Sequence, residues 1–507
     1  MKEPSAVKRF LSSLDQFFVN TLLFGIAVLF LLRSVHKSRK RRTLEISLCC
    51  ARPPTERDRF PYDFFGVAKT LELASHFQNR SSLPYTHSLF KKYGETFTSN
   101  VIGYRLIFTC NEENTKYLLA TAFTDFDSSP LRKSIIEPIT PHGIFTLDGP
   151  DWKMSRDQLR SRLSDLRKAI DLTLCEQHFQ SFLNKVPSDG QVFDAQSCAY
   201  ALALDLQTVF SLGESVDALS STQSSEKKSF LEDLSNVKDI IVRDGFRGPL
   251  RHLSSKRQFL QSCRRTREYV IRQATKQVKK RNQMAGISKK GDAGLPEAEQ
   301  ISRFTDQALS LLLANDSMST TLTSIMFCLS KDERVVKKLR ASIIDTIGLT
   351  PPTWAQLGTL QYLRWVMNEA MRLFPAVVFN ARVANKNTTL PTGGGEGGVS
   401  PVLIEKGEIV VFSTWSRHRL GKDFGRNLER FYPERWETLS PDMPGFIPFN
   451  KGPRACPGQH YATIIVTYIV ARMFQTFSTV IDYNTKPWTE RISMTFENEN
   501  GVMIGLL

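Results

Sequence analysis

The residues best suited to chemistry surround one cysteine, Cys456, near the C-terminus. It lies in the stretch FNKGPRACPG, with glycines at 452 and 458 and with Arg454 two residues before it. The apolar run Tyr461 to Phe474 follows and predicts a helix. The positive end of a helix favours an anionic sulfur, and glycine lets the backbone approach a flat group closely. The pattern predicts a thiolate offered to a metal, with Arg454 meeting a carboxylate. The alternative is a buried structural thiol.

From Phe449 to Gly458 the same stretch matches F-x-x-G-x-R-x-C-x-G at every fixed position. It resembles the haem-ligand loop of the cytochrome P450 family. The resemblance implies haem b as the cofactor and Cys456 as the thiolate ligand of its iron, a ligand that favours O–O cleavage. It also implies that Phe449, Arg454 and Gly458 belong to the cofactor-binding residues.

Two further stretches are expected to contact the same cofactor. Pro150 and Asp151 predict a helix start, and Trp152 and Arg156 then share one face of that helix. In the family, a W-x-x-x-R helix holds a haem propionate, and Arg382 resembles a second propionate contact. Without the cysteine loop, the pair would indicate only a surface arginine packed on a tryptophan.

An E-x-x-R motif, Glu369 to Arg372, lies in a helix predicted for 361–375. Residues three apart on a helix can pair, and the motif alone is common. Its context, NEAMRLFP followed later by Arg435 in FYPERW, resembles the family's buried charge network of Glu369, Arg372 and Arg435 behind the haem loop. Losing one member of such a network leaves an uncompensated buried charge.

A long, mostly apolar helix is predicted from Phe304 to Leu329, with a polar break at 314–320. In the family this helix crosses above the haem, and an acid followed by a threonine relays protons there. Aligning its continuation places Ser317 at the acid and Met318 at the threonine, and methionine cannot donate a proton. Asp316 and Ser317 form an acid–alcohol pair one position earlier, which a helical bulge would rotate into place. Otherwise water or the substrate supplies the relay.

The substrate pocket expected from the resemblance is apolar, which indicates a lipophilic substrate. Its candidate residues are Ile135, Ile136, Leu313, Ala314, Val377, Val378, Phe379 and Met494. Residues 210–219 and the glycine-rich turn 389–402 look like the family's fungal branch of alkane and fatty-acid hydroxylases. That likeness favours a fatty acid, an alkane or a secondary-metabolite intermediate. The turn lacks the G-K-S/T ending of a phosphate loop.

The N-terminus predicts a membrane anchor. The apolar run Phe17 to Leu32 has 16 residues, slightly short of the roughly 20 of a full span, and six Lys or Arg follow within 33–42. The positive-inside rule places the N-terminus in the lumen. A cleaved signal peptide, the alternative, would carry its charge ahead of the apolar run. We expect residues 1–48 to be a single-pass endoplasmic-reticulum anchor with a basic stop-transfer segment, and 49–507 to be the haem-thiolate catalytic domain.

The net charge of +16 fits nucleic acid, anionic membrane or an acidic protein partner. No zinc-finger spacing or RNA-binding signature is present, so we expect no nucleic acid. The 8 cysteines form no C-x-x-C pair, which excludes a disulfide framework. Lys256 to Lys290 holds twelve Lys or Arg and one acid, indicating a solvated helix or contact with anionic lipid.

The resemblance implies a mainly helical fold with a small β-rich lobe, the cytochrome P450 fold, behind a transmembrane helix. Residues 94–112 alternate as a half-buried hairpin does, and a C-terminal hairpin is expected around Asn498 to Gly501. The implied activity is a monooxygenase supplied with electrons by NADPH–cytochrome P450 reductase, whose acidic surface would suit the basic face around Lys451.

Met318 keeps two alternatives open. One is a haem-thiolate isomerase or dehydratase that rearranges a peroxide without a reductase. The other is a non-catalytic haem-binding membrane protein with an eroded oxygen site.

Overall fold

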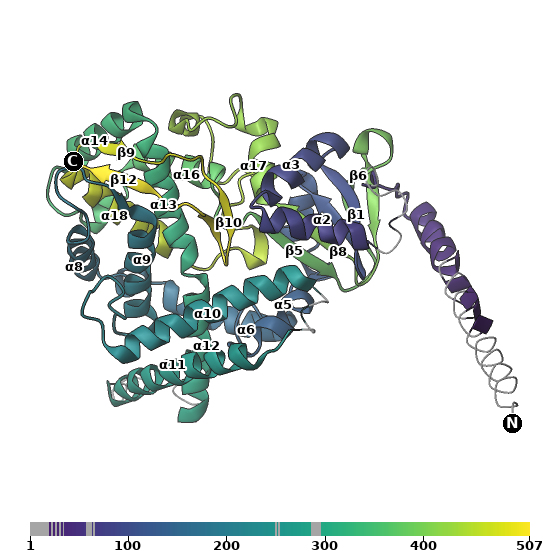
Figure 1. Cartoon of the computed structure of the whole chain (residues 1–507), viewed down its shortest axis with the longest axis horizontal. Coiled ribbons are helices and arrows are strands. Elements are labelled where there is room, and N and C mark those ends of the chain that lie inside the picture. The colour runs from purple at the N-terminus through teal and green to yellow at the C-terminus, as the bar shows by residue number, and fades with distance from the viewer. Residues whose placement is uncertain are drawn as a thin grey trace, which may run out of the picture.

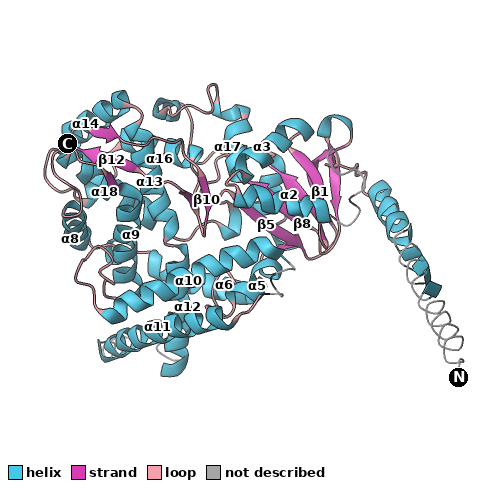
Figure 2. Ribbon diagram, in the orientation of Figure 1, coloured by secondary structure: helices cyan, strands magenta, loops and turns pink. Residues whose placement is uncertain are grey.

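The computed structural model describes residues 20–21, 24–25, 28–29, 32–33, 35–56, 63, 66–248, 251, 254–284 and 296–507. Helices fill most of the body, and the larger sheet lies at the end from which the N-terminal segment leaves (Figure 2). The expectation of a mainly helical fold with a small β-rich lobe is confirmed.

Long helices build the body (Figure 1). They are α6 (Gly149–Leu163), α8 (Leu172–Leu183), α9 (Ala195–Leu212), α10 (Ser225–Arg247), α11 (Arg257–Met284), α12 (Glu297–Ala314), α13 (Asp316–Ser330), α14 (Glu333–Ile347), α16 (Gln361–Leu373) and α18 (Gln459–Thr476). The other helices are α2 (Val67–Gln78), α3 (Ser82–Tyr93), α4 (Glu112–Lys116), α5 (Ser129–Ile136), α7 (Leu166–Ala169), α15 (Trp354–Leu357) and α17 (Thr414–Leu420). Single turns include η1 (Tyr117–Thr121), η8 (Pro433–Glu437) and η9 (Gly452–Arg454).

The main core forms where α13, α16 and α18 meet α8 and α9. Leu322, Ile325 and Leu329 recur along α13 at helical spacing and are almost fully buried. Polar residues instead occupy the start of α13, where Asn315 separates it from α12. The structure thus divides the single long helix expected for 304–329 into two helices, and the division falls within the polar stretch 314–320.

The β-rich lobe is a five-stranded sheet in the order β1-β2-β8-β5-β3. Its strands are β1 (Thr96–Val101), β2 (Tyr104–Thr109), β3 (Phe126–Asp127), β5 (Phe379–Ala384) and β8 (Ile409–Ser413). β1 and β2 pair antiparallel, which confirms the hairpin expected within 94–112. The glycine-rich turn joins β6 (Thr388–Gly394) to β7 (Ser400–Ile404).

The hairpin expected around Asn498 to Gly501 is wrong. β10 (Glu490–Ile492) pairs with β11 (Phe496–Asn498), whereas β12 (Met503–Leu506) pairs with β4 (Phe193–Asp194) and β9 (Val480–Asp482). The Asp194 carboxylate accepts the Val502 amide at 3.0 Å, which draws the last strand away from β11. The turn is present, but the strands on its two sides enter different sheets.

The described residues 35–47 are helical and lead away from the body, at the right of Figure 1. Arg41 holds this segment to the lobe, because its guanidinium lies 2.6 Å from Glu405 and 2.7 Å from Glu408. Within the described part of the chain, no helix is long and apolar enough to cross a membrane. The run Phe17 to Leu32 lies largely outside the described residues, so the anchor stays a prediction.

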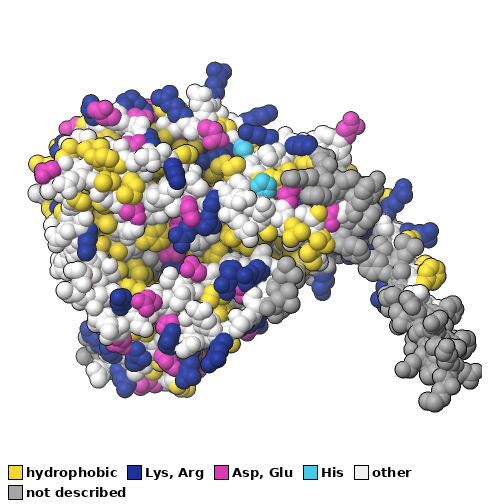
Figure 3. All heavy atoms as spheres, viewed as in Figure 1, with side chains coloured by type: hydrophobic (Ala, Val, Ile, Leu, Met, Phe, Trp, Pro, Cys, Tyr) yellow, Lys and Arg dark blue, Asp and Glu magenta, His cyan; other side chains and the backbone are white. Residues whose placement is uncertain are grey.

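The basic run forms α11, along the lower edge of the body in Figure 3, where Lys and Arg alternate with some acids. Arg265 and Arg272 of α11 pair with Asp233 and Glu226 of α10. Part of the positive charge is thus used between the two helices. Lipid contact by α11 stays a prediction.

Glu434 on η8 connects two helices. Its carboxylate accepts hydrogen bonds from Arg334 at 2.7 Å and Lys338 at 3.0 Å, both on α14, and from the Tyr362 hydroxyl of α16 at 2.9 Å. Burial disfavours the ionised carboxyl, but these hydrogen bonds outweigh it and lower the pKa of Glu434 from 4.5 to about 2. When folding lowers the pKa of a carboxyl, that carboxyl stabilises the protein at pH values above its pKa in the unfolded chain. This contribution is lost as the pH falls through its pKa in the folded protein.

Glu434→Gln should therefore remove about 1–2 kcal/mol of stability at neutral pH, a figure reduced for solvent screening of the exposed cations. The deficit should shrink as the pH is lowered from 4.5 toward 2. Urea unfolding across that range measures it. Glu437→Gln, an exposed neighbour on the same turn, is the control. A deficit that stays the same at all pH values would contradict this account.

Candidate active site around Cys456

Cys456 lies between η9 and α18, in a loop that is hydrogen-bonded to itself. Its amide donates to the Phe449 carbonyl oxygen at 2.8 Å. The thiol lies deep among protein atoms and still keeps an exposed surface, so it faces open space rather than packed side chains. Burial raises the pKa of the thiol, while the Gly458 amide and Arg156 act in the opposite direction. A coordinated metal ion deprotonates such a thiol, so this position suits a thiolate ligand.

The two glycines of the loop have different roles. Gly452 has a φ of +67°, and a Cβ placed there would lie 2.0 Å from the Leu119 carbonyl oxygen of η1. Only glycine fits this close approach. Gly458 has an ordinary φ of −92°. A Cβ at Gly458 would meet only the Cys456 Sγ, at 4.0 Å. Its lack of a side chain keeps the space beside the sulfur clear.

The N-terminal part of α6 is tied to the cysteine loop. The Arg454 guanidinium lies 4.3 Å from the Trp152 ring centroid, and the Arg156 guanidinium lies 5.5 Å from it. Arg156 also donates to the Ala455 carbonyl oxygen at 2.5 Å. Arg454 pairs with Asp148, the N-cap residue of α6, and donates to the Leu147 carbonyl oxygen at 3.0 Å. The structure thus brings Trp152, Arg156 and Arg454 together around Cys456.

A second arginine pair lies near Arg454. Arg382 of β5 and Arg132 of α5 both donate to the Asn380 Oδ1, at 3.2 and 2.6 Å. Burial, with repulsion from Arg132 and Arg454, lowers the pKa of Arg382 to about 9. Burial likewise lowers the pKa of Arg454 to about 10, against the opposing effect of Asp148. All these guanidinium groups stay cationic at neutral pH.

This cluster fits the carboxylates of a haem. Asp148 attracts the guanidinium groups of Arg132, Arg382 and Arg454, but only Arg454 pairs with it directly, and Asp127 adds a weaker attraction on Arg454. The Arg454 Nε is buried and has no hydrogen-bond partner among the described residues. A buried cluster with excess positive charge and an unpaired donor is stabilised by an anionic group.

Arg132 was missed by the sequence analysis. The available signal was its position three residues before Ile135, a predicted pocket residue. Residues three apart on a helix lie on one side of it, and a cation beside an apolar pocket is unusual unless it has an anion to bind.

Glu369, Arg372 and Arg435 form one buried cluster. The Glu369 carboxylate has no exposed surface and accepts two hydrogen bonds from Arg372 and one from Arg435, each at 2.9 Å. The Trp436 indole and the Tyr432 amide add two more, each at 3.0 Å. The carboxylate is fully hydrogen-bonded, which is the condition under which a buried ion pair is tolerated.

His418 was also missed. Its Nδ1 donates to the Arg372 carbonyl oxygen at 3.2 Å, and its Nε2 accepts the Ile447 amide at 3.1 Å. Burial, aided by Arg372, lowers the pKa of His418 well below its ordinary value, so the ring is neutral and its Nε2 is free to accept. The imidazole joins the end of α16 to the segment that enters the cysteine loop. A single buried histidine carries no motif that a sequence could reveal.

Between α12 and α13 the described residues form a tightened turn, and not the helical bulge that was one of the two alternatives for the relay. Asn315 keeps helical dihedral angles, and the Met318 amide bonds to the Asn315 carbonyl oxygen at 3.1 Å, which tightens the turn instead. Asp316 accepts from Lys238 of α10 at 2.6 Å. The Ser317 hydroxyl donates to the Ala314 carbonyl oxygen at 2.9 Å. Met318 packs in the main core.

The structure brings together part of the predicted pocket. Ile135, Ile136 and Leu313 share one hydrophobic cluster, and Met494 packs against it. Val378 and Phe379 belong to a different cluster, with Leu83 and Phe496. Ala314 is partly buried and Val377 is 37% exposed, and neither lies in these clusters. The role of these residues as the lining of a substrate pocket stays a prediction.

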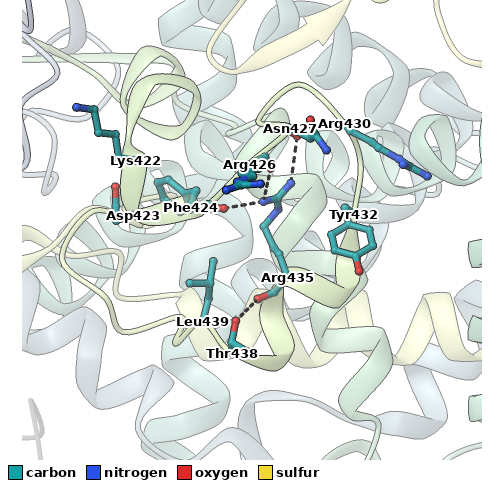
Figure 4. Close-up of a pocket in the computed structure, with 11 residues that line it drawn as sticks. Lys422, Asp423, Phe424, Arg426, Asn427, Arg430, Tyr432, Arg435, Thr438 and Leu439 are labelled. Atoms are coloured by element: carbon teal, nitrogen blue, oxygen red, sulfur yellow. Dashed lines mark hydrogen bonds between the residues drawn. The ribbon is translucent and has the colours of Figure 1, made fainter.

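A hollow of about 530 Å³ lies elsewhere, lined by Arg435 and by residues 422–427 among others (Figure 4). In it the Arg435 guanidinium donates to the Phe424 carbonyl oxygen at 2.6 Å and to the Asn427 carbonyl oxygen at 3.3 Å. Arg426 and Arg430 also line it. The predicted haem and substrate residues do not.

Glu369→Ala would leave two buried guanidinium groups uncompensated. It should destabilise the protein by about 3–5 kcal/mol and abolish haem loading. The haem-to-protein ratio after purification and urea unfolding measure both effects. Asn368→Ala, the preceding residue on α16, is the control. Soluble, haem-replete Glu369→Ala protein would refute the expectation.

Arg132→Ala should weaken haem retention without unfolding the protein. Losing one charge-assisted hydrogen bond costs about 1.5–3 kcal/mol, which corresponds to roughly tenfold or greater acceleration of haem loss. Transfer of haem to apomyoglobin measures the rate. Lys133→Ala, which removes an exposed cation from the same helix, should leave the rate unchanged. Equal rates for both variants would exclude Arg132 from the cofactor site.

Comparison with known proteins agrees with this geometry. The family model described as cytochrome P450 matches residues 62–503. Similar proteins include the cytochrome P450 monooxygenase fsdH of Fusarium heterosporum, 31% identical over 96% of this chain and 88% of that protein. The cytochrome P450 monooxygenase FPY7 of Fusarium mangiferae is 31% identical, covering 92% of each chain. Cytochrome P450 52A12 of Debaryomyces hansenii is 32% identical over 90% of this chain and 92% of its own length. The chain belongs to the cytochrome P450 family of monooxygenases, which hold haem iron through a cysteine thiolate.

Proposed function

We propose that this protein is a membrane-bound monooxygenase that inserts one oxygen atom from O₂ into a fatty acid, an alkane or a secondary-metabolite intermediate. The apolar cluster of Ile135, Ile136 and Leu313, with Met494 beside it, carries this proposal. Asp316 and Ser317, the acid and the alcohol, follow the cluster residue Leu313 closely along the chain. The likeness to the fungal hydroxylase branch supports an aliphatic substrate.

Haem bound through a cysteine thiolate supplies the activation of O₂. Cys456 would be its ligand, and Arg132, Arg382 and Arg454 would hold its carboxylates. Arg156, the further carboxylate contact that the family resemblance implies, also donates to the Ala455 carbonyl oxygen of the cysteine loop.

The apolar side chains would exclude water and orient the substrate chain. At the start of α13, the Asp316 carboxylate exchanges a proton, and the adjacent Ser317 hydroxyl passes it toward the reacting site. In the structure that hydroxyl donates to Ala314, so the relay requires it to rotate.

Electrons would come from NADPH through a reductase. Lys451, near the cysteine, is only half-exposed, and its ammonium donates to the Asp442 carbonyl oxygen at 3.3 Å. The exposed cations Lys422, Arg426 and Arg430 line the hollow beside Arg435 (Figure 4). This surface has the charge to receive an acidic partner.

Residues 1–48 would anchor the chain in the endoplasmic-reticulum membrane, with a lumenal N-terminus and the catalytic domain, 49–507, in the cytosol. The apolar run and the basic segment behind it support this orientation. Arg41, by pairing with Glu405 and Glu408, would hold the lobe close to the membrane-proximal helix.

A second candidate function is reductase-independent rearrangement of a lipid peroxide. One observation favours it: Met318, aligned with the family's threonine, packs in the core and offers no hydroxyl.

One experiment separates the two. Haem-loaded protein should convert fatty acids or alkanes to products that carry oxygen from isotopically labelled O₂, and only with NADPH and reductase. Cys456→Ser should abolish turnover, whereas Cys198→Ser, which changes a half-buried thiol, should not. Turnover of lipid hydroperoxide alone would replace the monooxygenase proposal with the second candidate. Haem-loaded protein inactive in both assays would contradict both.

A further inference from the structure

The hollow beside Arg435 carries an excess of positive charge. Four of the residues that line it are cationic and one is acidic (Figure 4). The cations are Lys422, Arg426, Arg430 and Arg435, and the acid is Asp423. Among the described residues, Arg435 is the one of these four cations that has an ion-pair partner, the Glu369 carboxylate at 2.9 Å. The other three cationic residues are exposed.

The acidic side chains near the hollow are already paired with other arginines. Asp423 lies 2.6 Å from Arg417, and Glu429 lies 3.1 Å from Arg419. No acid other than Asp423 between residues 422 and 439 lines the hollow. Three positive charges are therefore not neutralised by any described side chain, and they attract an anion from outside the chain.

The hollow has the size and the lining of a small-molecule site. Its volume, about 530 Å³, lies within the range of ligand pockets. Phe424, Tyr432 and Leu439 contribute to its lining, and low-dielectric walls around charges of one sign concentrate their potential inside a concave site. Figure 4 shows Lys422 and Arg430 on opposite sides of the hollow. A ligand in the hollow would therefore lie between separate cations.

The number and type of these cations favour a phosphate-bearing ligand. A guanidinium group offers paired donors that match the oxygens of a phosphate. A single carboxylate would balance one of the three unpaired charges, whereas a diphosphate group carries several negative charges. The lining thus fits a polyanion better than a simple organic acid.

The main chain of this segment is joined to the buried Glu369 cluster. Arg435 donates to the Arg426 carbonyl oxygen at 3.2 Å, and Arg372 donates to the Arg430 carbonyl oxygen at 3.3 Å. Both donors also bind the Glu369 carboxylate. The two arginines that face the hollow are thus attached through their backbones to the cluster behind the cysteine loop. A ligand that fixes their side chains would stabilise that cluster, because binding to the folded state alone favours folding.

We propose that the hollow beside Arg435 is a binding site for a small phosphate-bearing polyanion, held by Lys422, Arg426 and Arg430, and that the bound anion stabilises the haem-loaded protein. The site is separate from the cysteine loop and from the predicted substrate pocket. The inference goes beyond the proposed monooxygenase function and does not rest on it, because it concerns haem-loaded protein without substrate or reductase.

The test measures the binding of pyrophosphate to haem-loaded protein by isothermal titration calorimetry, at an ionic strength held constant with chloride. We expect one site per chain. Arg426→Gln should weaken binding about tenfold or more, because a charge-assisted hydrogen bond to the anion is lost. Arg426→Lys, which keeps the charge without the forked donors, should fall between Arg426→Gln and the parent.

ADP in place of pyrophosphate identifies the source of the phosphate groups. Tighter binding of ADP, with the gain lost in Tyr432→Leu, would assign the site to an organic diphosphate whose ring stacks on Tyr432. Binding of ADP no tighter than that of pyrophosphate would assign it to an inorganic polyphosphate. Both results support a phosphate site.

Arg364→Gln is the matched control, since it removes an exposed arginine of α16 that does not line the hollow and should leave the affinity unchanged. Pyrophosphate should also raise the midpoint of thermal unfolding of the parent and slow its loss of haem to apomyoglobin. Arg426→Gln should lose most of both effects. This second readout separates binding in the hollow from the general effect of phosphate salts on protein stability.

Equal affinities of Arg426→Gln and Arg364→Gln for pyrophosphate, or no binding to the parent, would overturn the proposal. So would an Arg426→Gln protein that keeps its affinity for pyrophosphate and instead binds an acidic reductase more weakly, because the hollow would then belong to a protein partner.

Discussion

The buried carboxylate of Glu369 is the interaction on which the cysteine side of the site depends. Five hydrogen bonds from Arg372, Arg435, Trp436 and Tyr432 converge on it. Those donors come from α16 and from the segment around η8, which are far apart in the sequence. Each donor is stabilising only while the carboxylate is present, because an isolated buried guanidinium is strongly unfavourable. The cluster therefore forms as a unit and fixes the chain behind Cys456.

A series of hydrogen bonds to main-chain atoms connects this cluster to the cysteine loop. Arg372 donates to the His418 carbonyl oxygen at 3.0 Å, and His418 in turn holds the Ile447 amide. Ile447 lies two residues before Phe449, whose carbonyl oxygen receives the Cys456 amide. On the other side, Arg156 and Arg454 fasten the loop to α6. The thiol is thus placed by contacts that do not involve its sulfur.

The opposite side of the site is built differently. The Asp316 carboxylate accepts from one lysine, and the Thr320 hydroxyl donates to the Asp316 carbonyl oxygen, so no saturated charge cluster surrounds this residue. The contrast is physically reasonable, because a metal ligand needs a fixed position whereas proton transfer needs a group that can move.

Motifs with fixed spacing could be read from the sequence. The loop at Cys456, the helix start before Trp152, the pairing of Glu369 with Arg372 and the break near Asn315 all depend on residues close together in the chain. Arg132, His418 and Lys238 could not be found in this way, because their partners lie 29 to 248 residues away. Composition also gives no sign of where α10 begins. Residues 222–228 look polar enough for a loop, but Ser224 caps a helix that begins at Ser225.

The last strand, β12, is another case in which local sequence does not predict the tertiary contacts. Asn498 to Gly501 has the composition of a hairpin turn, and a turn is indeed present there. Which strands then pair is decided by Asp194, some 300 residues earlier, where it accepts the Val502 amide. Turn chemistry predicts a change of direction, and only the tertiary contacts determine the sheet.

The central claim is that the protein holds Cys456 as a thiolate ligand of haem iron. The reduced carbon-monoxide difference spectrum of the purified, full-length protein tests it most directly. The account predicts the absorption band characteristic of a thiolate-ligated haem, and its loss in Cys456→Ser. A band at the position typical of histidine ligation, or no Soret absorption after haem is supplied, would contradict it.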